Sequence, residues 1–193
     1  MDIRVRNTMA AVRKALIDLM ANESFEDISI SKLCAAAEIS RKTFYMHYSS
    51  LDDVVKDIGK NFYEQIFNNF HQKDRNYTMR DLLIDINSIV VKNLDFYYKM
   101  ATSKSHHEFH LALEIAFQKI VADVLRINYG LTSENLDYYS SFYASGIISV
   151  YGNWFRNHEK KNADEILRIV TNCCFLTSEQ VIEQSKLRHE KKD

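Results

Sequence analysis

One stretch of the chain, Ser29–Tyr48, constrains the fold more than any other part of the sequence. Its first half places apolar residues at helical spacings of three and four, at Ile30, Leu33, Cys34 and Ala37. This pattern breaks at Glu38. Ser40 follows the break, and its hydroxyl can accept a hydrogen bond from a free amide at the start of a new helix. The sequence therefore predicts two short helices joined by a tight turn.

The second of these helices has one apolar face and one polar face. Phe44 and Tyr48 lie four residues apart and are expected to pack inward. No acidic residue occurs between Ser40 and Tyr48. The residues expected to face outward are Arg41, Lys42, Thr43, Tyr45 and His47. A polar, acid-free helix that follows a short helix and a tight turn is typical of a helix-turn-helix that binds DNA.

The same residues resemble the N-terminal domain of the tetracycline-repressor-like (TetR) regulators. That family has a small or alanine-rich turn, then Ser, a basic residue, Thr, an aromatic pair and His before a closing aromatic residue. Two positions depart from the family pattern: Glu38 stands where Gly is usual, and Leu51 stands where a Lys or Arg usually contacts phosphate. A residue with a Cβ is disfavoured at positive φ, so Glu38 is expected to strain a turn that needs such a φ.

The resemblance implies a role for the polar residues of this stretch. Those expected to face base edges in the major groove are Lys42, Thr43 and Tyr45. Those expected to hold phosphates, which fixes the register on DNA, are Arg41, His47, Tyr48 and Ser29 or Ser31. Ser40 and Met46 complete the expected DNA-binding residues. A homodimer would place two such helices roughly 34–36 Å apart on a palindromic operator.

The rest of the chain favours helices as well. It contains no proline and four glycines, which suits long helices and suits a turn-rich sheet poorly. Apolar periodicity predicts helices over residues 4–21, 54–70, 82–100, 109–125 and 134–158, and a last one after residue 165. We therefore expect an all-α fold. The expected domains are a helix-turn-helix DNA-binding domain at residues 1–50 and a helical ligand-binding and dimerisation domain at residues 51–193.

Net charge and cysteine usage limit the environment of the protein. The formal net charge is −1 at pH 7, so any affinity for DNA must come from locally placed charge. The basic residues before Tyr48 are Arg4, Arg6, Arg13, Lys14, Lys32, Arg41 and Lys42. We expect no signal peptide, and no stretch approaches the ~18–20 apolar residues of a membrane span. Three cysteines without paired spacing favour a reduced, cytoplasmic compartment.

The last two long helices are apolar on broad faces, and such a pair buries more area when it meets its own copy in a four-helix bundle. The resemblance also implies a homodimer joined through these helices. The expected interface residues are Tyr139, Tyr143, Ile147, Val150, Trp154, Ile169, Cys173 and Leu176. Gly146 and Gly152 either permit close helix approach or are merely tolerated. The segment from Phe142 to Asn157 resembles the C-terminal region of the dihydroxyacetone-kinase-regulator-like variety of the family.

Several functions remain open for the C-terminal helices. A set of aromatic residues either lines a pocket for a small-molecule inducer or forms plain core: Phe62, Phe67, Phe96, Tyr97, Phe117, Tyr139 and Tyr143. The first hypothesis is a regulator, most simply a repressor that a small molecule releases from its operator. The second is an interaction protein of the same fold that responds to a protein partner.

The third hypothesis is a metal-dependent enzyme that uses His106, His107 and His110 with Glu114. The alternative is that these histidines simply lie on a solvent-exposed helix face. The sequence has no nucleophile–base pair, no phosphate-binding glycine loop and no supported carboxylate pair, so we expect neither catalysis nor a cofactor. Cys173 and Cys174 are expected to be small buried residues, because neighbours on a helix point about 100° apart.

Overall fold

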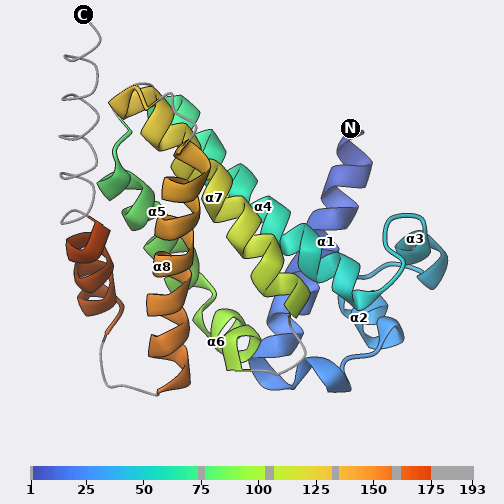
Figure 1. Cartoon of the computed structure of the whole chain (residues 1–193). Coiled ribbons are helices and arrows are strands. Elements are labelled where there is room, and N and C mark those ends of the chain that lie inside the picture. Colours follow the sequence, from blue (N-terminus) through green and yellow to red (C-terminus); the bar gives the residue numbers. More distant parts are fainter. Residues whose placement is uncertain (1, 74–76, 103–106, 132–134, 158–161, 175–193) are drawn as a thin grey trace, which may run out of the picture. The chain divides into compact units, whose positions relative to one another are not determined.

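The computed structural model describes residues 2–73, 77–102, 107–131, 135–157 and 162–174 (Figure 1). The helices are α1 (Ile3–Asn22), α2 (Ile30–Ala36), α3 (Arg41–Tyr45), α4 (Leu51–Lys73), α5 (Met79–Lys92), α6 (Leu94–Thr102), α7 (His107–Tyr129) and α8 (Leu136–Arg156), with a 3-10 turn, η1 (Phe25–Asp27). A further helix covers residues 163–174. No strand occurs in these ranges, and the predicted all-α class is confirmed.

The chain divides into two compact units. The N-terminal unit consists of Met1–Phe62 and Asn93–Leu113, and the C-terminal unit consists of Tyr63–Lys92 and Glu114–Asp193. Helices α4 and α7 each contribute to both units. The predicted domain boundary after residue 50 stays a prediction, because the compact units divide at other places: inside α4, between α5 and α6, and inside α7.

In the N-terminal unit, α1 packs against α2 and α6. On its inward face, Val12, Leu16 and Met20 are fully buried. Near the end of α1, Lys99 of α6 donates a hydrogen bond to the backbone oxygen of Glu23 at 3.1 Å. The core of this unit therefore includes a helix from the middle of the chain.

In the C-terminal unit, side-chain hydrogen bonds join α8 to its neighbours. Tyr151 donates to Asn87 Oδ1 of α5 at 3.0 Å, and both side chains are buried. Ser145 donates to Glu114 Oε1 of α7 at 3.1 Å. The helix at residues 163–174 lies beside α8 (Figure 1), and residues of both helices line a common groove.

Two helix ends have local signals in the sequence: residues Thr78 to Asp81 have the spacing of a capping box, and Gly130 is typical of a C-terminal cap. Thr78 and Asp81 form this capping box reciprocally. The Asp81 N–H donates to Thr78 Oγ1 at 3.2 Å, and the Thr78 N–H donates to Asp81 Oδ2 at 2.9 Å. Gly130 ends α7 at φ +62°, and its N–H donates to Arg126 O at 3.1 Å, as in an αL cap. The sequence predicts Thr132 or Ser133 as the cap of the next helix, and both lie outside the described residues.

Two predicted helix boundaries were wrong. The helix expected over residues 82–100 is interrupted at Asn93, which separates α5 from α6 and also separates the two units. Asparagine competes for backbone hydrogen bonds and is a poor helix former, which fits a break there. Helix α4 continues through His71 to Lys73, although its polar end was expected to be loop.

Candidate nucleic-acid interface

The helix-turn-helix forms where the sequence predicted it. The Ser29 hydroxyl accepts from Lys32 N–H at 3.2 Å at the start of α2. The Ser40 hydroxyl accepts from Thr43 N–H at 3.0 Å at the start of α3. Leu33 and Phe44 are fully buried between the helices and the rest of the unit. Capping and burial together fix which face of α3 is left to solvent.

That exposed face carries residues on both sides of the buried Phe44. Tyr45 and Met46 are 50% and 70% exposed, and Arg41 and Lys42 are exposed as well. The Arg41 guanidinium lies 6.0 Å from the centre of the Tyr45 ring. Large aromatic and cationic side chains that face water together are suited to stack on sugars, contact base edges and pair with phosphates.

Some hydroxyl groups of the predicted DNA-binding set are already engaged. Thr43 is half-buried, and its Oγ1 lies 2.9 Å from Ser40 Oγ in a hydrogen bond. Ser29 serves as the N-cap of α2, and Ser31 is exposed in the first turn of the same helix. His47 is half-buried beside Tyr48. DNA contacts by Ser29, Ser31, Ser40, Thr43 and His47 remain predictions.

The structure does not support the phosphate contact predicted for Tyr48. Its side chain is buried, and its hydroxyl donates to Asp57 Oδ2 of α4 at 2.6 Å. Arg13 of α1 donates to the same oxygen at 2.7 Å. Burial, together with the bond to the Asp57 carboxylate, raises the pKa of Tyr48, so its hydroxyl stays a donor over the working pH range. Sequence reasoning missed Arg13 and Asp57, because nothing in their spacing marks them as partners.

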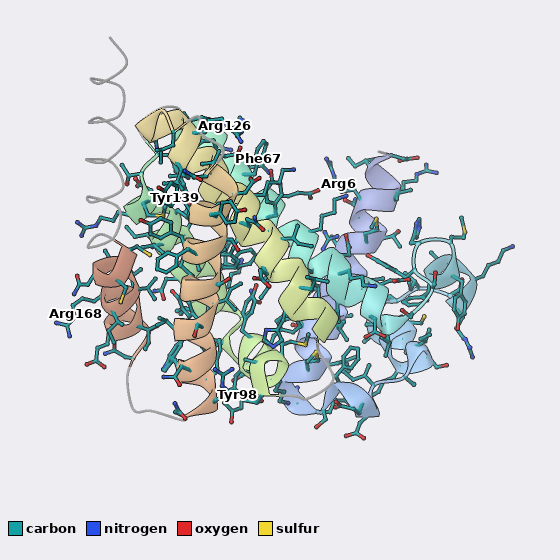
Figure 2. All side chains as sticks on the ribbon, in the orientation of Figure 1. Arg6, Phe67, Tyr98, Arg126, Tyr139 and Arg168 are labelled. Atoms are coloured by element: carbon teal, nitrogen blue, oxygen red, sulfur yellow. The ribbon has the colours of Figure 1, made fainter. Side chains whose placement is uncertain are left out.

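The structure sorts the basic residues near the interface into two groups. Three are paired with carboxylates: Arg13 with Asp57, Lys14 with Asp18 and Lys32 with Glu23. The others are exposed and have no ion pair within the described part of the chain: Arg4, Arg6, Arg41 and Lys42. Arg6 projects from α1 (Figure 2). The unpaired charge thus comes from α1 and α3, and the two arginines of α1 were not in the predicted contact set.

The turn between α2 and α3 has the strained residue that the sequence predicted. Glu38 has φ +54°, the one positive φ of a non-glycine residue in the described ranges. Its side chain is exposed. A Cβ at such a φ costs roughly 1 kcal/mol, so the turn forms against a local penalty that the surrounding core outweighs.

Replacing Glu38 by glycine should therefore raise the melting temperature by up to about 2–4 °C. Relief of the strain is offset in part by the greater freedom of glycine in the unfolded chain. Glu38→Ala is the matched control, because it removes the carboxylate and keeps the Cβ. Thermal unfolding followed by circular dichroism would test this, and an equal gain in Glu38→Ala would assign the effect to charge instead of strain.

The predicted pocket residues belong to two different compact units. Phe62, Phe96 and Tyr97 are buried in the N-terminal unit, where the Phe62 and Tyr97 rings lie 6.2 Å apart. The others belong to the C-terminal unit: Phe67, Phe117, Tyr139 and Tyr143. Phe67 and Tyr139, labelled in Figure 2, are half-buried on α4 and α8. Their role in ligand binding remains a prediction.

Two open grooves of the C-terminal unit are lined by other residues than those predicted for the pocket. One, of about 360 Å³, is lined by Ser149, Val150, Asn153, Trp154, Arg156, Ile166 and Ile169. The other, of about 480 Å³, is lined by Arg80, Ile84, Asp164, Leu167, Arg168, Thr171 and Asn172. Both lie against the helix at residues 163–174.

The predicted dimer interface needs correction on α8. Tyr143 and Ile147 are buried inside their own protomer, so neither side chain is available to a second copy. Val150, Trp154 and Ile169 are half-buried along a groove. Cys173 is exposed, contrary to the expectation that it is buried, and Leu176 lies outside the described residues.

The outward face of α8 carries other apolar residues. Tyr138 and Phe142 are 76% and 63% exposed, and Ile115 is exposed on α7 in the same unit. Gly146, one turn beyond Phe142, has open space where a Cβ would lie. The periodicity of the sequence did not separate this face from the inward one, because α8 is apolar on both.

The remaining candidate sites of the sequence give no further chemistry in the described residues. His106 lies outside them, as does the side chain of His107, and no cluster of three metal-ligating residues occurs in the part that is described. Cys34 and Cys174 are buried free thiols. Burial raises the pKa of Cys174 to about 12, with a smaller contribution from Cys173.

Comparison with known proteins defines the class. The profile of the TetR family described as "Transcriptional regulator C-terminal region" matches residues 77–174, which is about half of the chain. The chain belongs to the TetR family of transcriptional regulators. Proteins of this family are regulators and not enzymes; they bind DNA operators and dimerise. No helix of the described residues has the length and hydropathy to cross a membrane.

Individual proteins are similar to this chain in sequence or in fold. The chain is 25% identical over 118 residues to the dhaKLM operon transcriptional activator DhaS of Lactococcus lactis, a match that spans 60% of this chain and 62% of that protein. A solved structure of a dihydroxyacetone kinase operon activator DhaS has a TM-score of 0.69 at 18% identity, and covers 88% of this chain and 94% of its own. A TetR-family repressor, FadR of Thermus thermophilus in complex with lauroyl-CoA, has a TM-score of 0.60 at 17% identity, with 85% and 91% covered.

Proposed function

We propose that this protein is a DNA-binding regulator that acts in the cytoplasm as a homodimer on a palindromic operator. The single observation that carries the proposal is the exposed face of α3. It presents Arg41, Lys42 and Tyr45 to solvent without an acidic neighbour in the helix, while Phe44 is fully buried behind them. A capped helix with such a face matches the second helix of a helix-turn-helix, which enters the major groove.

In this proposal the residues divide by function. Lys42, Thr43 and Tyr45 contact base edges, and Arg41 supports them with a phosphate contact. Arg4 and Arg6 add positive charge from α1, which strengthens attraction to the backbone irrespective of sequence. The overall charge of −1 makes this local concentration decisive for binding.

We assign the second copy to the outward face of α8. Tyr138 and Phe142 expose large rings there, and such a patch on a monomer is a usual mark of an interaction site. The space over Gly146 can receive an aromatic ring from the partner. In a two-fold arrangement each copy would contribute the same ring and the same space. Val150 and Trp154 flank this face.

The C-terminal unit is proposed to carry the regulatory signal. A small molecule or a protein partner would shift the protein between conformers only as far as its affinities for the two differ. The relatives include a protein titled an activator and one titled a repressor, so we propose regulation of transcription by operator binding without assigning its sign.

Selection from a library of random DNA tests the proposal. We expect enrichment of an inverted repeat whose half-sites are centred about one helical turn apart, roughly 34–36 Å. Selection with Tyr45→Ala should give no enrichment or a relaxed motif. If the wild-type protein enriches no motif in repeated rounds, sequence-specific DNA binding is wrong for this protein.

A further prediction concerns Leu51, the first residue of α4. Asp52 and Asp53 follow it in the first turn, and the Asp53 side chain accepts from Ser49 N–H at 2.9 Å. This helix start therefore lacks a cation and carries two acids. Leu51→Lys should tighten binding to operator and random DNA alike, and steepen the logarithmic salt dependence by about one unit per half-site.

Binding titrations at several salt concentrations would measure both effects. Leu51→Gln is the control, because it removes the same apolar side chain without adding charge. An unchanged slope and affinity in Leu51→Lys would mean that the start of α4 does not approach the phosphate backbone.

A further inference from the structure

One carboxylate oxygen joins three segments of the N-terminal unit. Tyr48, which follows α3, donates its hydroxyl to Asp57 Oδ2 at 2.6 Å. Arg13 of α1 donates Nη1 to the same oxygen at 2.7 Å. The side chains of Arg13 and Asp57 are only 16% and 14% exposed. Charged hydrogen bonds in such surroundings are short and strong, unlike ion pairs at the open surface.

This cluster lies directly behind the proposed reading helix. The rings of Tyr48 and Phe44 lie 5.6 Å apart, so Tyr48 forms part of the surface against which the buried side of α3 packs. Helix α3 has five residues, of which only Phe44 is buried. The tilt of the exposed Lys42 and Tyr45 therefore depends on where Tyr48 is held.

We propose that Arg13 and Asp57 are positioning residues for operator recognition: they hold Tyr48, and through it α3, at the angle that base contacts require. This role rests on the proposed function of α3. Base-edge contacts tolerate small displacements poorly, whereas long cationic side chains can follow a phosphate when the helix tilts. A loosened α3 should consequently lose affinity for its operator and keep most of its affinity for random DNA.

Tyr48→Phe is the most conservative test, and the chain offers a matched control. Tyr77 is fully buried and donates its hydroxyl to Asp85 Oδ2 at 2.8 Å in the C-terminal unit. Tyr48→Phe and Tyr77→Phe thus each remove one part-buried Tyr–Asp hydrogen bond, and both should lower the melting temperature. Only Tyr48→Phe should weaken operator binding, by about fivefold or more, while its affinity for random DNA changes by less than about twofold.

The titrations use DNA selected by the wild-type protein and a temperature well below the melting temperature of every variant. Stoichiometric binding measures the fraction of each protein that is active. A purely structural role would lower the active fraction and leave the dissociation constant of the active protein unchanged. Asp57→Asn provides a second variant. In a double-mutant cycle its effect on operator binding should largely disappear in the Tyr48→Phe background.

Two results would overturn this role alone: operator affinity of Tyr48→Phe equal to that of the wild type, or an equal loss on operator and random DNA. Additive effects of Tyr48→Phe and Asp57→Asn would also contradict it. A wild-type protein that prefers no selected DNA over random DNA would instead overturn the proposed function, and this role with it.

Discussion

Replacing Ile147 by glutamate should unfold the C-terminal unit, although the residue lies on the helix expected to join two protomers. Ile147 is 1% exposed within its own protomer. A charge placed there has no partner and costs roughly 3–5 kcal/mol, against a total stability of about 5–15 kcal/mol for a typical domain. Circular dichroism should show a large loss of helix at room temperature or a melting temperature lowered by well over ten degrees.

Phe142→Glu is the informative partner of that variant, because it lies five positions earlier on the same helix and is 63% exposed. Its fold should be retained, and sedimentation should show monomers where the wild type shows dimers. Ile84→Glu, at an exposed position of α5, is the control and should stay dimeric. If Phe142→Glu remains a dimer, the outward face of α8 is not the interface.

The second large effect is expected in the reading helix. Tyr45→Ala should weaken operator binding by about 1–3 kcal/mol and relax the sequence preference. Thr43→Ala should do the same, with an added contribution from the lost hydrogen bond to Ser40. Lys42→Ala should have the same two effects if the Lys42 ammonium contacts a guanine. Competition titrations with operator and random DNA would measure each change.

The controls separate base contacts from general effects. Tyr45→Phe keeps the edge-to-face packing on Phe44, whose ring centre lies 5.4 Å away, and removes only the hydroxyl. Arg126→Ala removes an exposed positive charge from the C-terminal unit and should leave DNA binding unchanged. An equal loss of affinity on both DNAs for Tyr45→Ala would make Tyr45 a phosphate contact and not a base contact.

The fold was predictable wherever a local signal decided it. Capping residues such as Ser40, Thr78 and Gly130 act through bonds within a few positions, and the structure has each of them as expected. The departure at Glu38 was also visible, since a motif that usually has glycine implies a positive φ. The break at Asn93 was not, because the apolar periodicity continues through it and no proline or glycine marks it.

The site was predictable only on its exposed side. The face of α3 follows from the spacing of Phe44 and Tyr48, but the partners behind it lie far away in the sequence. Arg13 and Asp57 are separated by 44 positions, and only the packed helices bring them together. The same limit explains the error at Ile147, because helix α8 is apolar on two faces and periodicity cannot say which one the protomer covers for itself.

Site-specific photocrosslinking tests the central claim most directly. A photoreactive phenylalanine analogue would replace Tyr45 on α3 in one protein and Tyr138 on α8 in another, since both positions are exposed. Irradiation with selected operator DNA should link position 45 to bases within each half-site, and position 138 only to a second copy of the protein. Crosslinks to DNA from position 138 with none from position 45 would contradict the assignment of α3 as the reading helix.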